Sequence, residues 1–196
     1  MADHFVASVR AEFARSRDTV ARLEADEAIH ALVGAAVEAC LRALRSDGRI
    51  LFAGNGGSAA DCQHLAGEFV SRFAFDRPGL PGIALTTDTS VLTAIGNDYG
   101  YEHVFARQVQ AIGRRGDVLF GISTSGRSRN ILTAFDAARR AGIFTIGMTG
   151  QRGAEMAASC DLCIVAPAEE TPKVQEAHIV IGHTICALVE RAYFRA

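Results

Sequence analysis

The chain has 196 residues, a length that suits one α/β domain with an appended helical piece. Its 20 basic and 22 acidic residues give a net charge of −2, with no lysine-arginine run, which argues against nucleic-acid binding. No apolar run reaches membrane-spanning length, and the N-terminus carries charges where a signal peptide would be apolar. We therefore expect a cytoplasmic protein with neither a membrane nor a nucleic acid as partner.

The first segment in chain order, residues 2–46, is predicted to form two helices. Apolar residues recur at helical intervals up to residue 23, and more strongly from residue 29 to residue 44. Asp47-Gly48 is expected to end the second helix, with the glycine in the left-handed conformation. These helices have no strand beside them in the sequence, so their apolar faces must pack on the sheet layer or on another subunit.

After residue 47, short apolar runs alternate with helical patterns. Strands are predicted at 49–53, 82–86, 117–123, 143–148 and 161–166. Helices are predicted at 58–75, 88–96, 101–112, 128–141, 153–159 and 172–194. Strands that alternate with helices, several of them continuously apolar, indicate a parallel sheet covered on both faces, and thus an α/β fold.

Five scattered cysteines argue against a disulfide framework and fit a reducing compartment. Cys160 and Cys163 have the spacing of a redox or zinc pair, but there is only one such pair. Residues three apart on a strand point to opposite faces, so we expect both to pack as small hydrophobic side chains.

A glycine-rich loop, Gly54 to Ser58, follows the first predicted strand and opens a helix. Backbone N–H groups and the helix dipole converge there, as in anion sites. The loop lacks the Lys-Ser/Thr of a nucleotide P-loop but satisfies a loose dinucleotide pattern. A dinucleotide site expects an acid about 20 residues on, whereas the second strand ends farther away, at Asp88. A tight strand-to-helix turn without a ligand remains an alternative.

A second loop, residues 122–131, follows the strand predicted at 117–123 and reaches the start of a helix. Four hydroxyl residues surround Gly126 in it: Ser123, Thr124, Ser125 and Ser128. With the free N–H groups of the helix, they would form a neutral cradle for a phosphate dianion. Any one of them could be only a helix N-cap, but all four together are hard to explain by capping.

His64 and Glu68 are four residues apart, so both lie on one face of the predicted helix. An imidazole nitrogen and a carboxylate oxygen on adjacent turns can chelate zinc, although a surface His–Glu pair is the simpler alternative. The last predicted helix carries Gln175, His178 and His183 among apolar residues. Gln175 and His183 can border one pocket, but spacing cannot choose between the two histidines.

Four motifs resemble the phosphoheptose isomerases of the sugar-isomerase (SIS) domain family. They are AGNGGSAADCQHLAGEF, LTAIGNDYGYE, STSGRS and TPKVQEAHIVIGH. The resemblance covers about residues 27–194. It implies a flavodoxin-like three-layer α/β/α fold with a five-stranded parallel sheet and two additional N-terminal helices. It further implies a single SIS domain over 1–196, with oligomer contacts in 1–46 and an α/β core in 47–196, assembled as a homotetramer with active sites at subunit interfaces.

The same resemblance implies a set of site residues. Substrate contacts would fall on Asn55, Gly56, Gly57, Glu68, Asn97, Asp98, Ser123, Thr124, Ser125, Ser128 and Gln175. One zinc per subunit would be held by His64, Glu68, Gln175 and His183. The catalytic residues would be Glu68 as the base and His183 as the acid, which leaves His178 as a packing residue.

The implied reaction is an aldose–ketose isomerisation that converts sedoheptulose 7-phosphate to D-glycero-D-manno-heptose 7-phosphate through an enediol, the first step toward activated heptose for lipopolysaccharide or other surface glycans. Two alternatives stay open. One is a non-enzymatic relative that binds the replication initiator and resembles these isomerases closely; it lacks the counterparts of Glu68 and His183, both of which this chain keeps. The other is an isomerase of a different sugar phosphate.

Overall fold

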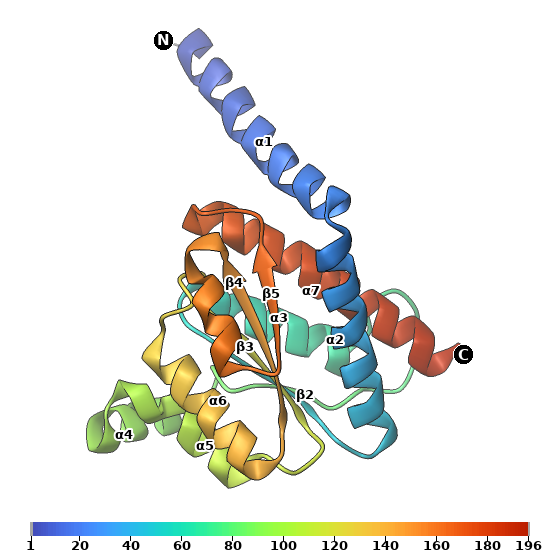
Figure 1. The fold of residues 1–196 in the computed structure, drawn as a ribbon, viewed down its shortest axis with the longest axis vertical. Coiled ribbons are helices and arrows are strands. Elements are labelled where there is room, and N and C mark those ends of the chain that lie inside the picture. The colour runs from blue at the N-terminus through green and yellow to red at the C-terminus, as the bar shows by residue number, and fades with distance from the viewer. Residues whose placement is uncertain (1, 196) are drawn as a thin grey trace.

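The computed structural model, which describes residues 2–195, contains one parallel sheet in the order β2-β1-β3-β4-β5 (Figure 1). Its strands are β1 (Ile50–Gly54), β2 (Gly82–Ala84), β3 (Val118–Ile122), β4 (Phe144–Gly150) and β5 (Leu162–Ala166). This is the flavodoxin-like strand order. The predicted fold class is therefore confirmed, and each strand ends within two residues of its predicted limits.

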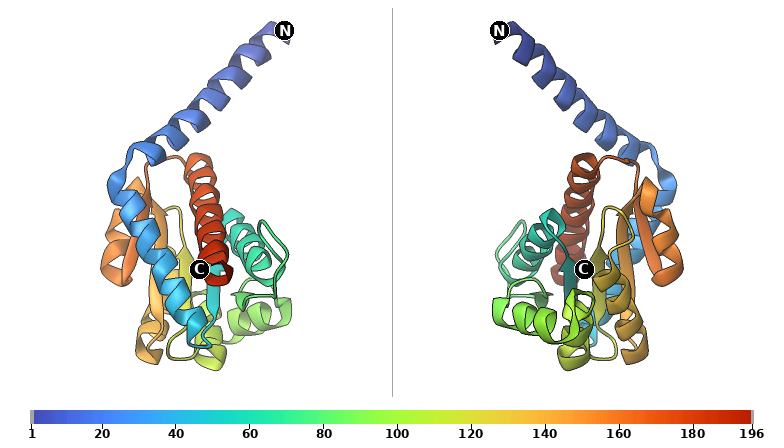
Figure 2. Two further views of the ribbon diagram at one scale, coloured as in Figure 1. Left: turned by 90° about the vertical axis from the view of Figure 1, so that its right-hand side faces the viewer. Right: turned by 90° about the vertical axis from the view of Figure 1, so that its left-hand side faces the viewer.

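Helices cover both faces of the sheet (Figure 2). They are α1 (Ala2–Ala25), α2 (Glu27–Arg45), α3 (Gly57–Val70), α4 (Thr89–Tyr99), α5 (Val104–Ile112), α6 (Arg129–Ala141) and α7 (Thr171–Phe194), with the 3-10 segments η1 (Tyr101–His103) and η2 (Gln151–Ser159). Buried residues of α2, α3 and α7 share one core with the sheet, and those of α5, α6 and η2 share the other. Within residues 2–195, no helix combines the length and apolar character that crossing a bilayer requires.

The two cores follow from the alternation of side chains along the strands. In β1, Ile50 and Phe52 join the core beneath α2, α3 and α7, whereas Leu51 and Ala53 join the core beneath α5 and α6. Successive side chains of a strand point to opposite faces, and every residue of β1 is buried. A continuously apolar strand is thus explained by a sheet with helices on both sides.

The first helix, α1, projects from the body of the molecule (Figures 1 and 2). Among its described side chains, Thr19 and Leu23 near its C-terminal end are buried. Lys173 of α7 donates a hydrogen bond to the Ser16 hydroxyl (2.8 Å), which holds the middle of α1 against α7. Farther out, Phe13 is 72% exposed. The predicted helix is present, but much of its apolar side lies outside the core.

The turn after α2 differs from its prediction. Asp47, not Gly48, takes the left-handed conformation, with φ of 59°. Aspartate tolerates this region because its short polar side chain can bond locally. Gly48 is required for a different reason, since a Cβ there would lie 2.8 Å from the Gly116 carbonyl oxygen. The glycine therefore permits a close approach of two backbone segments.

The helix predicted at 58–75 is wrong at its C-terminal end, because α3 stops at Val70. The guanidinium of Arg77 donates to the backbone carbonyl oxygens of Glu68 (2.8 Å) and Phe69 (2.6 Å), in the last turn of α3. Arg77 also pairs with the buried Glu190 of α7 at 2.9 Å. Burial opposes the charge of Glu190, but N–H groups of the loop and Arg77 outweigh it and lower the pKa of this carboxyl. The loop after α3 is therefore fixed to α7.

Candidate active site

The two predicted anion loops lie side by side at the carboxyl edge of the sheet. β1 and β3 are neighbours, so the loop after β1 and the loop after β3 meet where the strand order reverses, the usual ligand crevice of such sheets. Asn55 of the first loop and Asn130 of α6 exchange two amide hydrogen bonds, of 3.0 and 2.8 Å. The Tyr101 hydroxyl donates to the Oδ1 atom of the Asn55 side chain at 3.1 Å.

Asn130 and Tyr101 were not predicted as site residues. Asn130 is buried, with 4% exposure, and its amide orients Asn55. Both belong to motif segments that the sequence analysis singled out, yet only the fold reveals that they share a partner. A cavity of about 530 Å³ opens beside this trio and is also lined by Ser128 and Arg129. It is large enough for a sugar phosphate.

The loop after β3 forms a tight turn with its hydroxyls gathered together. The hydroxyl groups of Ser123 and Ser128 lie 2.9 Å apart, and the Arg127 N–H donates to the Ser125 hydroxyl at 3.3 Å. Gly126 has φ of 66°, and a Cβ there would lie 2.4 Å from the Gly153 carbonyl oxygen, so only glycine fits. Ser128 occupies the N-cap position of α6 without a side-chain cap bond, which leaves the first N–H groups of that helix available to an anion.

The loop after β1 places Gly56 at the N-cap of α3, with φ of 56°, and exposes it. Gly57 begins the helix. A Cβ on Gly57 would lie 2.2 Å from the Gln175 amide nitrogen, so the glycine makes room for the Gln175 side chain of α7 at the start of α3. The predicted contact residues Asn55, Gly56, Gly57 and Gln175 are thereby brought together.

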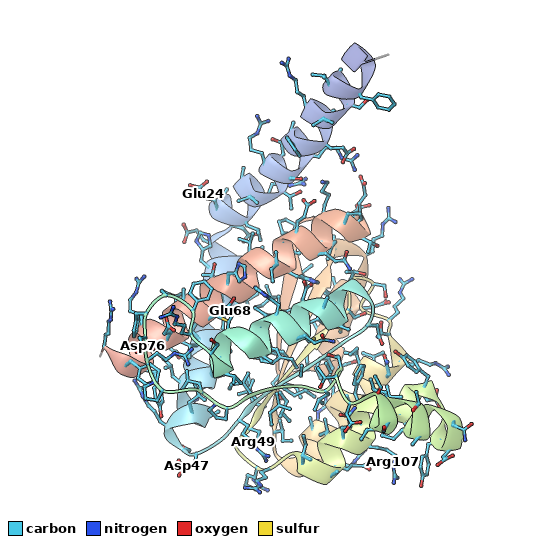
Figure 3. The ribbon with its side chains drawn as sticks, turned by 180° about the vertical axis from the view of Figure 1, so that it is seen from behind. Glu24, Asp47, Arg49, Glu68, Asp76 and Arg107 are labelled. Atoms are coloured by element: carbon cyan, nitrogen blue, oxygen red, sulfur yellow. The ribbon has the colours of Figure 1, made fainter. Side chains whose placement is uncertain are left out.

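Side chains of α3 and α7 form a second cluster, which we call the triad: His64, Glu68 and His183. Their candidate ligand atoms all lie within 4.8 Å of one another. The Nε2 atom of His64 lies 2.7 Å from Nε2 of His183 and 3.3 Å from Oε1 of Glu68. Glu68 lies on the side of α3 that faces α7 (Figure 3). The predicted pair of His64 and Glu68 is therefore joined by a third residue, and that residue is His183 rather than His178.

Asp61, one turn before His64, was missed by the sequence analysis. Its Oδ2 atom is buried and has no hydrogen-bond partner among the described residues. Burial raises the pKa of Asp61, while the nearby His64 and His183 act in the opposite direction. The i, i+3, i+7 spacing of Asp61, His64 and Glu68 on one helical face was the available signal. Phe73 closes another side of the triad, with its ring 5.6 Å from that of His183.

His178 lies away from this cluster, in the core beneath α7. It is 1% exposed, and burial lowers its pKa to about 4. Asn97 and Asp98 lie exposed in the last turn of α4, where the Asn97 amide donates to Asp98 at 2.8 Å. Among residues 2–195, no hydrogen bond or ion pair joins either of them to another predicted site residue.

Comparison with known proteins agrees with this geometry. The SIS domain family profile matches residues 13–150. The chain therefore belongs to the SIS domain family.

Three proteins show which branch of that family it occupies. The phosphoheptose isomerase of Burkholderia pseudomallei is 58% identical over 181 residues, which cover 92% of either chain. That of Aneurinibacillus thermoaerophilus is 60% identical over 171 residues, or 87% of this chain and 86% of its own. The solved phosphoheptose isomerase of Neisseria gonorrhoeae superposes with a TM-score of 0.88 at 43% identity, covering 95% of this chain and 98% of that one. Within the family, the chain groups with the phosphoheptose isomerases.

Proposed function

We propose that the protein is an aldose–ketose isomerase that converts sedoheptulose 7-phosphate to D-glycero-D-manno-heptose 7-phosphate, the first step of activated-heptose synthesis for lipopolysaccharide or other surface glycans. The names of the relatives support the substrate. The observation that carries the mechanism is the triad: a carboxylate and an imidazole from different helices have candidate ligand atoms within 4.8 Å of each other. Such a pair supplies the base and the acid that an enediol reaction needs.

The phosphate would be bound by the loop after β3, where Ser123, Thr124, Ser125 and Ser128 offer hydroxyl donors next to the free N–H groups of α6. Phosphate binding at one end of the sugar positions the reacting carbons at the other end. The sugar itself would contact Asn55, Gly56, Gly57, Glu68 and Gln175. We place Asn97 and Asp98 in the same set through a neighbouring subunit, because both are exposed on α4.

In the reaction, the Glu68 carboxylate takes a proton from carbon 1 of the ketose, and the resulting enediol receives it at carbon 2. His183 donates a proton to the oxygen on carbon 2 and accepts the proton of the oxygen on carbon 1. Phe73 shields one side of His183 from water. These transfers leave the number of protons on the enzyme unchanged after each turnover.

The donor set of the triad fits a divalent metal. Two imidazole nitrogens and one carboxylate are zinc ligands, and their candidate ligand atoms lie within 4.8 Å of one another. We propose one zinc per subunit, held by His64, Glu68, Gln175 and His183. When bound, zinc polarises the carbonyl and hydroxyl oxygens of the sugar. A Glu68 carboxylate has two oxygens, so one can bind metal while the other accepts the proton.

We further propose a homotetramer with active sites at the subunit interfaces, in which residues 1–46 supply contacts and residues 47–196 form the core of a single domain. Apolar residues on the outer half of α1, such as Val9 and Phe13, support this, as does an apolar groove of about 350 Å³ between α1, α2 and α7. Five free cysteines agree with a cytoplasmic location.

The proposed activity is tested by incubating purified protein with sedoheptulose 7-phosphate and assaying the aldose product. Unphosphorylated sedoheptulose is the matched control, since it keeps the reacting carbons and lacks the anchor. We expect conversion of the phosphate ester and little conversion of the free sugar. Absence of aldose from the phosphate ester would contradict the proposal.

A further inference from the structure

Two half-buried thiols meet at the edge of the sheet, contrary to the prediction that Cys160 and Cys163 point to opposite faces. Both pack against the core beneath α5 and α6. A Cβ on Gly147 of β4 would lie 2.9 Å from the Cys160 sulfur and 3.4 Å from the Cys163 sulfur. The strand rule fails because Cys160 lies in a bend between η2 and β5, before the strand begins.

The two thiols are chemically unequal. Hydrogen bonds from the Cys163 thiol and from the backbone of Gly147 lower the pKa of Cys160, while burial and the nearby Asp161 carboxylate act in the opposite direction. The hydrogen bond between the two thiols raises the pKa of Cys163. Cys40, Cys62 and Cys186 are buried, and burial raises the pKa of each. Cys160 and Cys163 are the two of the five that are not buried, so they are the thiols that a disulfide in solution can reach, and the direction of the pKa shifts favours Cys160 as the thiolate.

We propose that Cys160 and Cys163 form a reversible dithiol–disulfide pair that exchanges with small disulfides such as glutathione disulfide, with Cys160 as the attacking and Cys163 as the resolving thiol. The pair lies outside the proposed active site and on the opposite face of the sheet from the triad. It is a redox site in addition to the isomerase activity and does not depend on it.

The exchange is balanced in two steps. The Cys160 thiolate attacks one sulfur of glutathione disulfide, which forms a mixed disulfide and releases one glutathione thiolate. Cys163 then loses its proton and attacks the Cys160 sulfur, which forms the Cys160–Cys163 bond and releases the second glutathione. Two electrons pass from the protein to glutathione, and excess reduced glutathione reverses both steps.

The local structure accommodates this bond. Gly147 contributes no side chain to the space between the sulfurs, and Cys160 lies outside the paired residues of β5. Closure would break the 3.5 Å hydrogen bond that the Cys160 thiol donates to the Met156 carbonyl oxygen. The anchor of β5 is separate: the Asp161 carboxylate accepts hydrogen bonds from the backbone N–H (2.8 Å) and hydroxyl (2.7 Å) of Thr145. The bend can therefore adjust while the strand stays paired.

The test uses the full-length protein treated with glutathione disulfide, followed by thiol counting and peptide mass mapping. We expect the wild type to lose two thiols and to yield one peptide pair linked through Cys160 and Cys163, reversed by reduced glutathione. A treated wild type that keeps five thiols, or is linked through another pair, overturns the proposal. This measurement requires no variant.

Two variants assign the roles. Cys163→Ser should hold one glutathione stably on Cys160, because the resolving thiol is gone. Cys160→Ser should react more slowly by about tenfold, since Cys163 has the less acidic thiol. Equal rates in the two variants would overturn the assignment of Cys160 as the attacking thiol. Thermal unfolding of both variants confirms that they are folded.

Discussion

Two parts of the proposed active site differ in how far apart their residues lie in the sequence. They are the loop after β3 (residues 123–128), which we call the phosphate loop, and the triad between α3 and α7. The loop is local: six consecutive residues turn around Gly126, and its Ser123 and Ser128 hydroxyls already bond to each other. The triad joins side chains 119 positions apart and exists only because two helices pack closely. That approach depends on Gly182, where a Cβ would lie 2.7 Å from Leu65 of α3. In the proposed enzyme, phosphate binding would depend on local backbone geometry, whereas proton transfer would depend on the long-range packing of α3 against α7.

The largest expected effect is a loss of turnover when Glu68, the proposed catalytic base of the triad, is replaced. Glu68→Gln keeps the size of the side chain but cannot accept a proton, so the turnover rate should fall by about 10²–10⁴-fold. The measurement is hydrogen exchange at carbon 2 of the aldose in deuterated solvent, with metal content determined in the same sample. His178→Ala, on the same helix as His183 but outside the triad, is the control and should keep turnover. Equal exchange by wild type and Glu68→Gln would mean that another residue is the base.

Removal of the metal is the next test of the triad. One zinc per chain is expected by elemental analysis, and a chelator should remove both the metal and most of the activity, because a site with an amide ligand and one carboxylate is of moderate affinity. Added zinc should restore activity. The phosphate loop contains no metal ligand of this kind, so binding of inorganic phosphate should survive chelation. Metal-free protein with full activity would exclude a catalytic zinc.

The phosphate loop is tested by Ser123→Ala combined with Ser125→Ala. Each lost charge-assisted hydrogen bond should weaken substrate binding by about 1–3 kcal/mol and raise the Michaelis constant accordingly, with little change in thermal stability. Ser46→Ala, at the exposed end of α2, is the matched control. A Michaelis constant that stays at the wild-type value would remove this loop from substrate binding.

A smaller effect should follow from changing the packing that creates the triad. Gly182→Ala must displace the buried Leu65, a kind of overpacking that costs about 1–3 kcal/mol, and should reduce zinc affinity by separating α7 from α3. Gly67→Ala is the control, because a Cβ there meets nothing within 4 Å and alanine favours a helix by about 0.5–1 kcal/mol. The idea fails if both variants bind zinc as the wild type does.

The smallest expected effect is a pH dependence of the free energy of unfolding that His178, which lies outside the triad, should cause. Its pKa of about 4 lies below the 6.5 of an unfolded histidine, so the unfolded chain binds the extra proton first and stability is lost as the pH falls from about 6.5 toward 4. Between pH 7 and pH 5.5, this histidine should remove about 1 kcal/mol from the free energy of unfolding. Denaturant titrations of wild type and His178→Leu at both pH values measure it. If the two proteins lose equal stability, His178 is not the cause.

The sequence predicts local features of this molecule well. The strands were predicted because apolar runs alternate with helices, and the gathering of hydroxyl groups in the loop after β3 was predicted because all of them lie within six residues. The pairing of Asn55 with Asn130, and the burial of Asp61, could not be predicted, since each depends on how α6 or α7 packs against another element. Spacing alone also left His178 and His183 equivalent, and burial of the first now separates them.

The wrongly predicted end of α3 also shows that sequence periodicity does not reveal long-range contacts. The apolar pattern continues through Phe73 and Phe75, so periodicity extended the helix to residue 75. The chain instead turns at Ser71, because Arg77 folds back onto the carbonyl groups of α3 and pairs with Glu190, 113 positions later. No local sequence pattern predicts that Arg77 pairs with a residue so far along the chain. The same turn places the Phe73 ring next to His183 of the triad. The wrongly predicted segment is therefore one that borders the proposed site.

The projecting half of α1 has a consequence for the order of folding. A helix of 24 residues is about 36 Å long, and only its C-terminal part rests on the body of the chain. The outer turns extend a helix that the packed part has already nucleated, but helix extension without tertiary packing contributes little stability in water. In the proposed homotetramer, the outer turns of α1 would be stabilised by the neighbouring subunit that covers Val9 and Phe13. Folding of this segment would then be coupled to assembly of the proposed tetramer, so the helical content of α1 should rise with protein concentration.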